Sequence, residues 1–582
     1  MPSSPPSSLA PALAALHRGF RDRLVDYATL TAQVEAWAEA FPELVRLESL
    51  VTTPEGREQW LLTLGPEPER RRPGVWIDGN MHASELAGTS VCLAVAEDVL
   101  QLHLAPEEAL HDLPPAVRAQ LREVLFYVLP RVSPDGAEAV LDTGRFLRSV
   151  DRDERPNQAH PRWRAEDLDG DGLALLMRVP DPAGDFVEST EFPGLLVTRE
   201  IEDEGPFYRV FSEGVIDRWD GTTIPEPSFL SDNDPDLNRN FPYTWASEPK
   251  QMGAGPHPGS APESRALIEK ATELPHLFVW LNLHTFGGVH IRPRGDAPDA
   301  KMDQGDLALF RQVEAWTDAF TGYPMVSGFE QFTYDPDTPL HGDLSDWAYH
   351  DRGCLAWVCE LWDLFEKAGL PERKRFVDRY SHLDREHVLQ LARWDEAHNE
   401  GRIVRPWKPV MHPQLGEVEV GGLDPRIGVW NPPPEELPGV CDGQSAVFLR
   451  CAALLPRLHL SLEATPLGEG THAVTATLEN RGYLGTFGIP SAKSRPFSES
   501  PHVSVEVVGG ALASATDARA DLGHLDGWGK GRFTGHGSVA LQRSSGTRTR
   551  AQHRFVVTGG GEVRVRVESC RTGTVEATLQ LG

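Results

Sequence analysis

Cysteine is scarce in this sequence, and long apolar runs are missing from it. Only six of the 582 residues are cysteine: Cys92, Cys354, Cys359, Cys441, Cys451 and Cys570. Their scatter excludes zinc-ribbon spacing and favours reduced thiols over a disulfide framework. The opening segment lacks the basic start and apolar core of a secretory signal, and no apolar stretch could span a bilayer. We therefore expect a cytoplasmic protein without a membrane partner.

Positive charge is also in deficit. The chain has 56 Lys and Arg residues against 86 Asp and Glu residues, which gives a net charge of −30. Phosphate groups would be repelled by such a chain, so we expect neither a nucleic acid nor an anionic membrane as a partner. A hydrophobic content of 40% indicates a globular protein, and the length indicates more than one domain.

Apolar runs and helical patterns alternate along the first two thirds of the chain, which is typical of an α/β fold. Residues 86–100, 263 onwards and 305–321 have helical character. Strands are predicted where apolar runs are bounded by polar turns, at residues 57–65, 74–78, 124–129, 277–284 and 354–361.

Composition divides the chain into four parts. Residues 1–24 begin with a Pro/Ser-rich stretch, from which we expect a flexible tail. Residues 25–405 form the expected catalytic domain, and its polar, Pro- and Gly-rich segment 150–235 is predicted to be a surface insertion. Residues 406–582 contain short alternating runs such as 502–507 and 562–567, which predict an antiparallel β-sandwich.

The stretch from Gly74 to Glu85 carries the strongest chemical signal. An apolar strand ends in a short polar turn with His82 and Glu85, whose three-residue spacing lets both side chains grip one cation. A catalytic zinc takes three protein ligands and leaves one position to water, so a third ligand is expected at the end of another apolar strand. His284 meets that requirement. Alone, the His82–Glu85 pair is a weak signal, because chance pairs are common and a solvated loop would have the same sequence.

Two further acidic features, one glutamate and one cluster of aspartates, need an explanation. Glu360 stands at the end of an apolar strand, where an unpaired charge is costly, so a metal, a cation or a catalytic role is expected, with a structural salt bridge as the alternative. Asp167, Asp169 and Asp171 match the opening of a calcium loop, but Arg178 occupies the position of its bidentate glutamate. A turn of solvated acids is the favoured interpretation of that segment.

Together these residues resemble the zinc metallocarboxypeptidases of the carboxypeptidase A type over roughly residues 25–400. The resemblance implies a mixed central sheet flanked by helices. The motifs that carry it stand in the family's order: His82-x-x-Glu85, the turn sequence Ser133-Pro-Asp-Gly136, Arg145-Phe-Leu-Arg148, Asp236-x-Asn238-Arg239, His284, Gly342-x-x-x-Asp346-Trp and Glu360.

The same resemblance implies roles for single residues. One catalytic zinc would be held by His82, Glu85 and His284, and peptide or protein C-termini would be the substrate. The remaining roles follow residue by residue: Asp236 orients His82, Asn238 and Arg239 grip the terminal carboxylate, Arg148 polarises the scissile carbonyl, and Glu360 is the general base and acid.

Two positions depart from the family pattern. The mobile tyrosine of the family falls near Thr338 here, and the nearest tyrosine is Tyr334. The position that selects the substrate side chain matches Ser345, which is small and neutral. This argues against a preference for a terminal Lys or Arg, and leaves apolar and acidic preferences open.

Three other functions compete with a carboxypeptidase, and one of them, an adhesion protein led by the β-sandwich, is disfavoured by the missing export signal. A zinc deacylase of the aspartoacylase type, acting on N-acyl amino acids, shares the H-x-x-E motif and the later histidine, whereas the Asn238-Arg239 context favours the peptidase. A non-catalytic peptide-binding protein is disfavoured because every expected ligand and the base are present.

Overall fold

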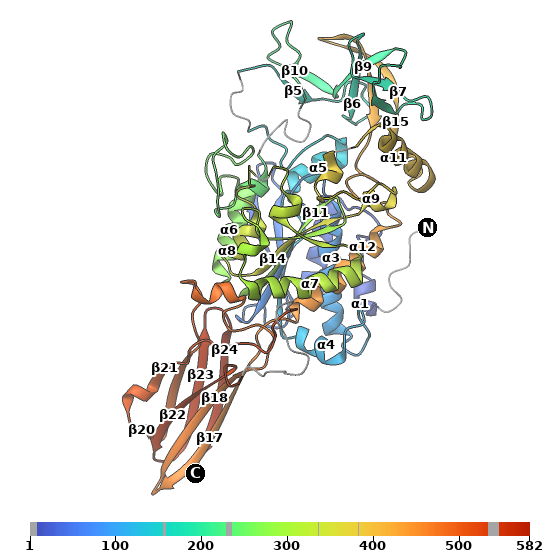
Figure 1. Ribbon diagram of the computed structural model, residues 1–582. Coiled ribbons are helices and arrows are strands. Elements are labelled where there is room, and N and C mark those ends of the chain that lie inside the picture. Colours follow the sequence, from blue (N-terminus) through green and yellow to red (C-terminus); the bar gives the residue numbers. More distant parts are fainter. Residues whose placement is uncertain (1–8, 155–158, 228–234, 336, 382, 533–545) are drawn as a thin grey trace, which may run out of the picture.

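A mixed eight-stranded sheet forms the centre of the catalytic domain (Figure 1). The computed structural model describes residues 9–154, 159–227, 235–335, 337–381, 383–532 and 546–582. The strand order is β1-β2-β4-β3-β11-β14-β12-β13, and the four strands from β4 to β14 run parallel. The strands are β1 (Val45–Thr52), β2 (Glu58–Leu64), β3 (Gly74–Asp78), β4 (Leu125–Leu129), β11 (Leu277–Thr285), β12 (Val289–Arg292), β13 (Met325–Ser327) and β14 (Leu355–Leu361).

Continuous burial of the parallel strands explains why they appear as apolar runs in the sequence. Every residue of β3, β4 and β11 is buried, because helices cover both faces of the sheet. Helices α3, α7 and α12 pack together on one side of β11 and β14, and α6 and α8 lie on the other side (Figure 1). The helices are α3 (Ala87–Leu104), α6 (Pro262–Glu273), α7 (Gln304–Thr321), α8 (Leu344–His350) and α12 (Leu437–Ala452). The predicted α/β fold with a mixed sheet is confirmed.

The insertion is a small β unit with its own core. Its larger sheet has the order β15-β16-β6-β9-β7-β8, and β5 pairs with β10. Buried apolar side chains such as Trp163 and Met177 hold it together. The strands are β5 (Arg162–Ala165), β6 (Leu176–Pro180), β7 (Phe186–Glu188), β8 (Leu196–Thr198), β9 (Phe207–Ser212), β10 (Gly214–Asp217), β15 (Val404–His412) and β16 (Gly416–Leu423).

The boundary expected at residue 406 is wrong. Strand β16 pairs with β6 of the insertion, so residues 404–423 complete that unit and do not begin a C-terminal domain. Helix α12 then returns to pack on α3 and α7 of the catalytic domain. Alternating apolar residues alone could not show which sheet these strands join.

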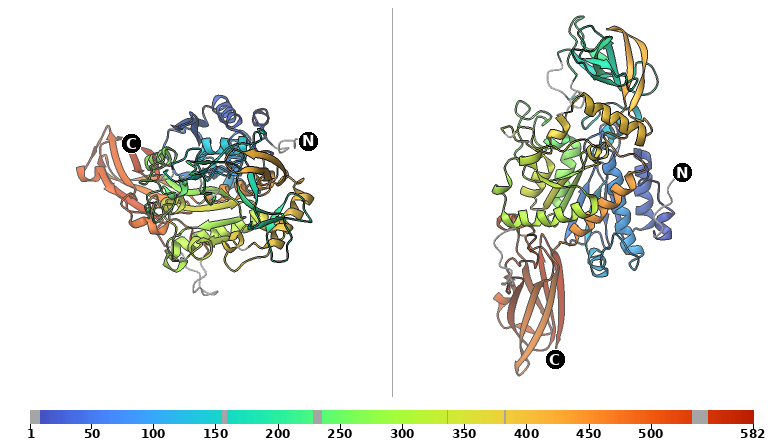
Figure 2. Two further views of the ribbon diagram at one scale, coloured as in Figure 1. Left: turned by 90° about the horizontal axis from the view of Figure 1, so that it is seen from above. Right: turned by 45° about the vertical axis from the view of Figure 1, so that its right-hand side comes forward.

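The C-terminal unit begins at β17 and has two four-stranded antiparallel sheets, ordered β17-β18-β22-β20 and β21-β19-β23-β24. Side chains such as Val474, Phe555 and Val565 fill the core between them. Figure 2 shows this unit and the insertion at opposite ends of the catalytic domain. The strands are β17 (Leu458–Gly468), β18 (Thr471–Asn480), β19 (His502–Val508), β20 (Ala511–Leu512), β21 (Arg519–Asp521), β22 (Arg550–Thr558), β23 (Gly561–Ser569) and β24 (Gly573–Leu581).

Two local predictions also need correction. The described part of the expected flexible tail, from residue 9, is packed: Leu13 and Phe20 are fully buried, and Arg21 forms ion pairs with Glu97 and Asp98. Residues 1–8 lie outside the described residues. The Ser133-Pro-Asp-Gly136 sequence is the start of helix α5 (Pro134–Thr143), because proline is well tolerated in the first helical turn.

Candidate metal centre and active-site pocket

Neighbouring parallel strands bring the predicted metal ligands together. His82 and Glu85 lie on the turn between β3 and α3, and His284 lies near the carboxyl end of β11. Strands β3 and β11 pair in parallel, with Asn282 opposite Asp78, so their carboxyl ends meet at one edge of the sheet. Side chains that are 199 residues apart therefore converge.

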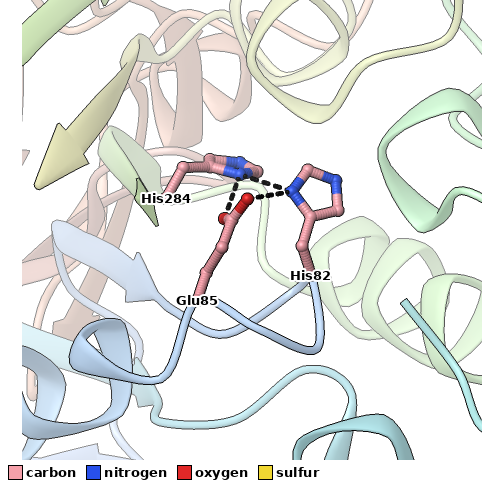
Figure 3. Close-up of side chains that lie close together, drawn as sticks. All are labelled: His82, Glu85 and His284. Carbon is pink, nitrogen blue, oxygen red and sulfur yellow. Dashed lines mark hydrogen bonds and ion pairs between the residues drawn. The ribbon is translucent and has the colours of Figure 1, made fainter. Parts of the chain in front are cut away.

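The three side chains point at one another (Figure 3). His82 Nδ1 lies 2.8 Å from Glu85 Oε1, and His284 Nδ1 lies 2.9 Å from Glu85 Oε2. The two Nδ1 atoms are 3.0 Å apart. All three residues are at least 97% buried, with exposed fractions of 3%, 3% and 2%.

Hydrogen bonds on the far sides of the two rings fix which nitrogens face the centre as acceptors. His82 Nε2 lies 3.1 Å from Asp236 Oδ1, and His284 Nε2 lies 2.5 Å from Asn282 Oδ1. Because both partners are acceptors, each Nε2 carries a hydrogen and donates it. A neutral ring then presents an unprotonated Nδ1 to Glu85. Two nitrogen lone pairs and a carboxylate converge, and this donor set fits a zinc ion.

A second layer of hydrogen bonds holds His284 through Asn282. The Asn282 amide donates to Asp78, whose other oxygen accepts from the indole nitrogens of Trp76 at 3.0 Å and Trp280 at 2.7 Å. Burial raises the pKa of the Asp78 carboxyl to about 6, so it is ionised at neutral pH and remains an acceptor. The ring of His284 is therefore anchored to two strands.

Glu360 lines the same pocket as the three candidate metal ligands but is not one of the converging group. It pairs with His284 across β11 and β14, so both side chains leave the sheet at the same level. Burial, and then the charge of Glu85, raise the pKa of Glu360 to about 8. A carboxylate held next to a metal centre but outside its ligand set is suited to proton transfer.

The other predicted site residues lie around the candidate metal ligands. Asp236 bridges His82 and Arg148, because its Oδ2 accepts from Arg148 Nε at 2.9 Å. Arg148 and Asp236 form an ion pair. Burial alone would raise the pKa of the Asp236 carboxyl, but Arg148 and His82 outweigh this effect and keep that pKa well below its usual range. Asn238 Oδ1 accepts from the Leu344 amide at 2.9 Å, and Arg239 donates to the Asn238 carbonyl at 2.7 Å.

One pocket of about 240 Å³ collects these groups. The predicted site residues that line it are His82, Glu85, Arg148, Asn238, Arg239, His284, Tyr334, Ser345 and Glu360, whereas Asp236 lies behind them. Tyr334 is 58% exposed and lies at the pocket's edge.

The selectivity expected from Ser345 needs revision. Ser345 Oγ donates to Asp343 Oδ1 at 2.7 Å, and Asp343 and Asp346 line the same pocket. The Gly295 amide donates to Asp346 Oδ2 at 2.9 Å. Because two carboxyl groups adjoin Ser345, its neutrality alone does not argue against a basic substrate side chain.

Sequence reasoning missed two aromatic residues in the pocket wall. Tyr380 lies on α10 (Asp378–Ser381), and its hydroxyl donates to the Phe286 carbonyl. Trp430 comes from beyond the expected end of the catalytic domain and packs edge-on against Phe286, with 5.3 Å between ring centres. No local motif marks either residue, because only the path of the folded chain brings them here.

A lysine side chain forms ion pairs with the acidic turn in the insertion. Lys408 Nζ lies 2.8 Å from Asp169 and 2.5 Å from Asp171. Asp167 and Asp169 approach the buried Glu213, whose two oxygens accept from the Leu168 and Leu175 amides at 2.7 and 3.1 Å. The ligand oxygens of Asp167, Asp169 and Glu213 lie within 4.8 Å of one another, and the Lys408 ammonium group balances part of their charge.

Comparison with known proteins identifies the family. The sequence profile described as zinc carboxypeptidase matches residues 30–174 and 216–378. The chain belongs to the zinc carboxypeptidase family. The break in this match coincides with strands β6 to β9 of the insertion. Residues 458–580 match a separate domain of unknown function, which covers the C-terminal unit.

Individual relatives match only part of this zinc carboxypeptidase homologue. A zinc carboxypeptidase of Saccharothrix mutabilis subsp. capreolus is 32% identical over 20% of the chain, and carboxypeptidase B of Astacus astacus is 29% identical over 22%. These matches span 25% and 37% of the two relatives' lengths. A crystal structure of thrombin activatable fibrinolysis inhibitor aligns with 16% identity and a TM-score of 0.40, covering 66% of this chain and 73% of that one.

The sequence predicts no membrane-spanning segment, and the lengths and hydropathy of the helices can be compared with that prediction. Among the described residues, none of the helices is both long enough and apolar enough to cross a bilayer. All six cysteines have free thiols, and five of them are buried.

Proposed function

We propose that this protein is a cytoplasmic, zinc-dependent carboxypeptidase that hydrolyses the C-terminal peptide bond of peptides or proteins. The observation that carries the proposal is a single pocket. It combines three converging metal-ligand side chains with Glu360, Arg148, Asn238 and Arg239. The family match supports the same reaction class and does not favour the aspartoacylase-type deacylase.

The zinc site fits this chemistry. His82, Glu85 and His284 would hold the zinc ion, which would supply a nucleophile at neutral pH by lowering the pKa of bound water to about 7 in favourable sites. Glu360 would accept the nucleophile's proton on a carboxylate oxygen and pass it to the leaving nitrogen.

Positive charge in the pocket has two separate tasks. Arg148, fixed through its Nε by Asp236, offers its other guanidinium hydrogens to the scissile carbonyl oxygen as negative charge develops there. Arg239 and Asn238 bind the terminal carboxylate, for which a planar guanidinium is well matched. Internal peptide bonds lack that carboxylate, so cleavage is confined to chain ends.

The test is a product analysis of the purified protein. A set of peptides that differ only in their last residue, including Lys, Arg, Leu, Phe and Glu, is incubated with the zinc-loaded protein and followed by mass spectrometry. Loss of one C-terminal residue, abolished by chelation and restored by zinc, supports the proposal. Release of an acyl group from N-acyl amino acids, with the peptides left intact, would refute it in favour of the deacylase.

A further inference from the structure

A short segment after β16 contacts the turn that carries His82 and Glu85 and the residues that directly follow β11 and β14. This strap, residues 424–431, lies beyond residue 378, where the family match ends. Its Trp430 packs on Phe286, two residues after His284. The Gly428 carbonyl accepts from Trp362 Nε1 at 3.0 Å, and Trp362 follows Glu360 by two residues.

Asn431 makes the third contact, at the metal-binding turn itself. Its Oδ1 accepts from the Ala87 amide at 2.9 Å, and its Nδ2 donates to the Ser84 carbonyl at 2.9 Å. These two backbone groups lie on either side of Glu85. Asn431 is fully buried, and its Nδ2 also donates to the Arg426 carbonyl at 2.9 Å. The amide therefore joins the strap to both flanks of a metal ligand.

The start of helix α3 explains why this contact matters. The residue before the helix, Leu86, supplies no side-chain cap, so the first amides of α3 need other acceptors. Asn431 satisfies the Ala87 amide from a position 344 residues away. Without it, a buried donor and a buried acceptor on the Glu85 turn would both lose their partner, which is unfavourable for groups that water does not reach.

The strap is itself well anchored. Arg426 donates to the Leu141 carbonyl at 2.6 Å and pairs with Asp424 at 2.8 Å. Asn399 donates to the Ile427 carbonyl at 3.1 Å. The strap connects the insertion's sheet to α12. Because both ends are anchored, Asn431 is held in a fixed position next to the turn that carries Glu85.

We propose that Asn431 is a positioning residue for the metal centre, acting through the backbone on both sides of Glu85. The strap completes the site from outside the family's matched region. This inference rests on the zinc site of the proposed function but not on any substrate. A protein that binds zinc yet cleaves no peptide would refute the function and leave the following test intact.

Zinc affinity measured by chelator competition on the full chain tests this directly. Asn431→Ala is expected to weaken zinc binding about 10-fold or more, as losses around metal ligands commonly do. Asn431→Asp keeps an acceptor for Ala87 but cannot donate to Ser84, so an intermediate loss is expected. A folded Asn431→Ala or Asn431→Asp protein that binds zinc as tightly as the wild type would overturn the proposal.

Asn480→Ala is the matched control. Asn480 is a buried asparagine of the C-terminal unit that also bridges backbone groups, accepting from Arg457 and donating to Leu484 at 3.0 and 2.8 Å. Its loss is expected to lower thermal stability and leave zinc affinity unchanged. An equal loss of affinity in Asn480→Ala would reduce the Asn431 effect to general destabilisation and count against the proposal.

A measurement on the wild type covers the case in which neither Asn431 variant folds. If the strap and the metal site are coupled, zinc must stabilise the strap as the strap stabilises zinc binding. Hydrogen exchange of residues 424–431 is expected to slow on zinc loading of the apo protein, with no change in the C-terminal sheets. Unchanged exchange in the strap would contradict the coupling.

Discussion

His284 and Glu360 are paired residues on neighbouring parallel strands, β11 and β14. This register places a metal ligand and a carboxylate at the same level of one sheet edge, with Glu85 on the adjoining turn. Since both strands are almost completely buried, a one-residue slip would move one of the two side chains to the opposite face. The fold therefore fixes the distance between the metal centre and its proposed base.

Removal of the Glu360 carboxylate should abolish turnover and spare the metal. Because Gln cannot accept the proton, Glu360→Gln is expected to lower kcat by about 10²–10⁴-fold. Zinc content should stay at the wild-type value, because Glu360 is not a ligand. Glu366→Gln changes an exposed carboxylate six residues further on and serves as the control. Substantial activity in Glu360→Gln would show that another group transfers the proton.

Arg239 is predicted to recognise the substrate's charged end. Arg239→Gln should lower kcat/KM for peptides with a free C-terminal carboxylate by roughly 10- to 100-fold, since a charge-assisted pair is lost. Slow hydrolysis of C-terminally amidated peptides should change little, because they have no carboxylate to bind. Arg265→Gln removes a guanidinium that donates to the Gly259 and Ser260 carbonyls and should leave both rates unaltered. An equal loss on both substrate types would rule out this role.

Asp78 is expected to hold His284 in place through Asn282. Asp78→Asn replaces an acceptor of three N–H groups with an amide that has only one oxygen, leaving buried donors unpaired at about 1–3 kcal/mol each. Equilibrium unfolding in urea should show this loss of stability. Zinc affinity should also fall because Asn282 no longer holds His284. Wild-type values for both quantities would contradict the proposed support.

The strands of the central sheet and the candidate metal ligands could be predicted from sequence because buried strands appear as continuous apolar runs. Strands such as β11 and β14 are apolar along nearly their whole length, and the polar residue at each carboxyl end stands out. No such pattern marks Asn431 and Trp430. Their place depends on β16 joining the insertion's sheet, a pairing between segments far apart in sequence. The Pro- and Ser-rich composition of the first residues likewise did not indicate that Leu13 and Phe20 pack into the core.

Glu213 gives the insertion a predicted pH dependence. Burial, and then the nearby Asp169 and Asp167, raise the pKa of Glu213 from 4.5 to about 7 in the folded protein. The folded state thus binds a proton more tightly, so the stabilising contribution is complete below about pH 4.5 and is lost as the pH rises through 7. Hydrogen exchange in β9 and β10 should become faster between pH 5 and 8, after correction for intrinsic rates. Glu213→Gln should remove this trend, and an unchanged trend in the variant would assign it to another group.

The central claim is that His82, Glu85 and His284 form one zinc site, and metal analysis of the purified protein tests it most directly. We predict one tightly bound zinc per chain in the wild type and at most a trace in His284→Ala, with His290→Ala, a buried histidine outside the site, retaining the metal. A wild-type chain that binds no zinc after reconstitution, or a His284→Ala chain that binds it as tightly as the wild type, would contradict the account.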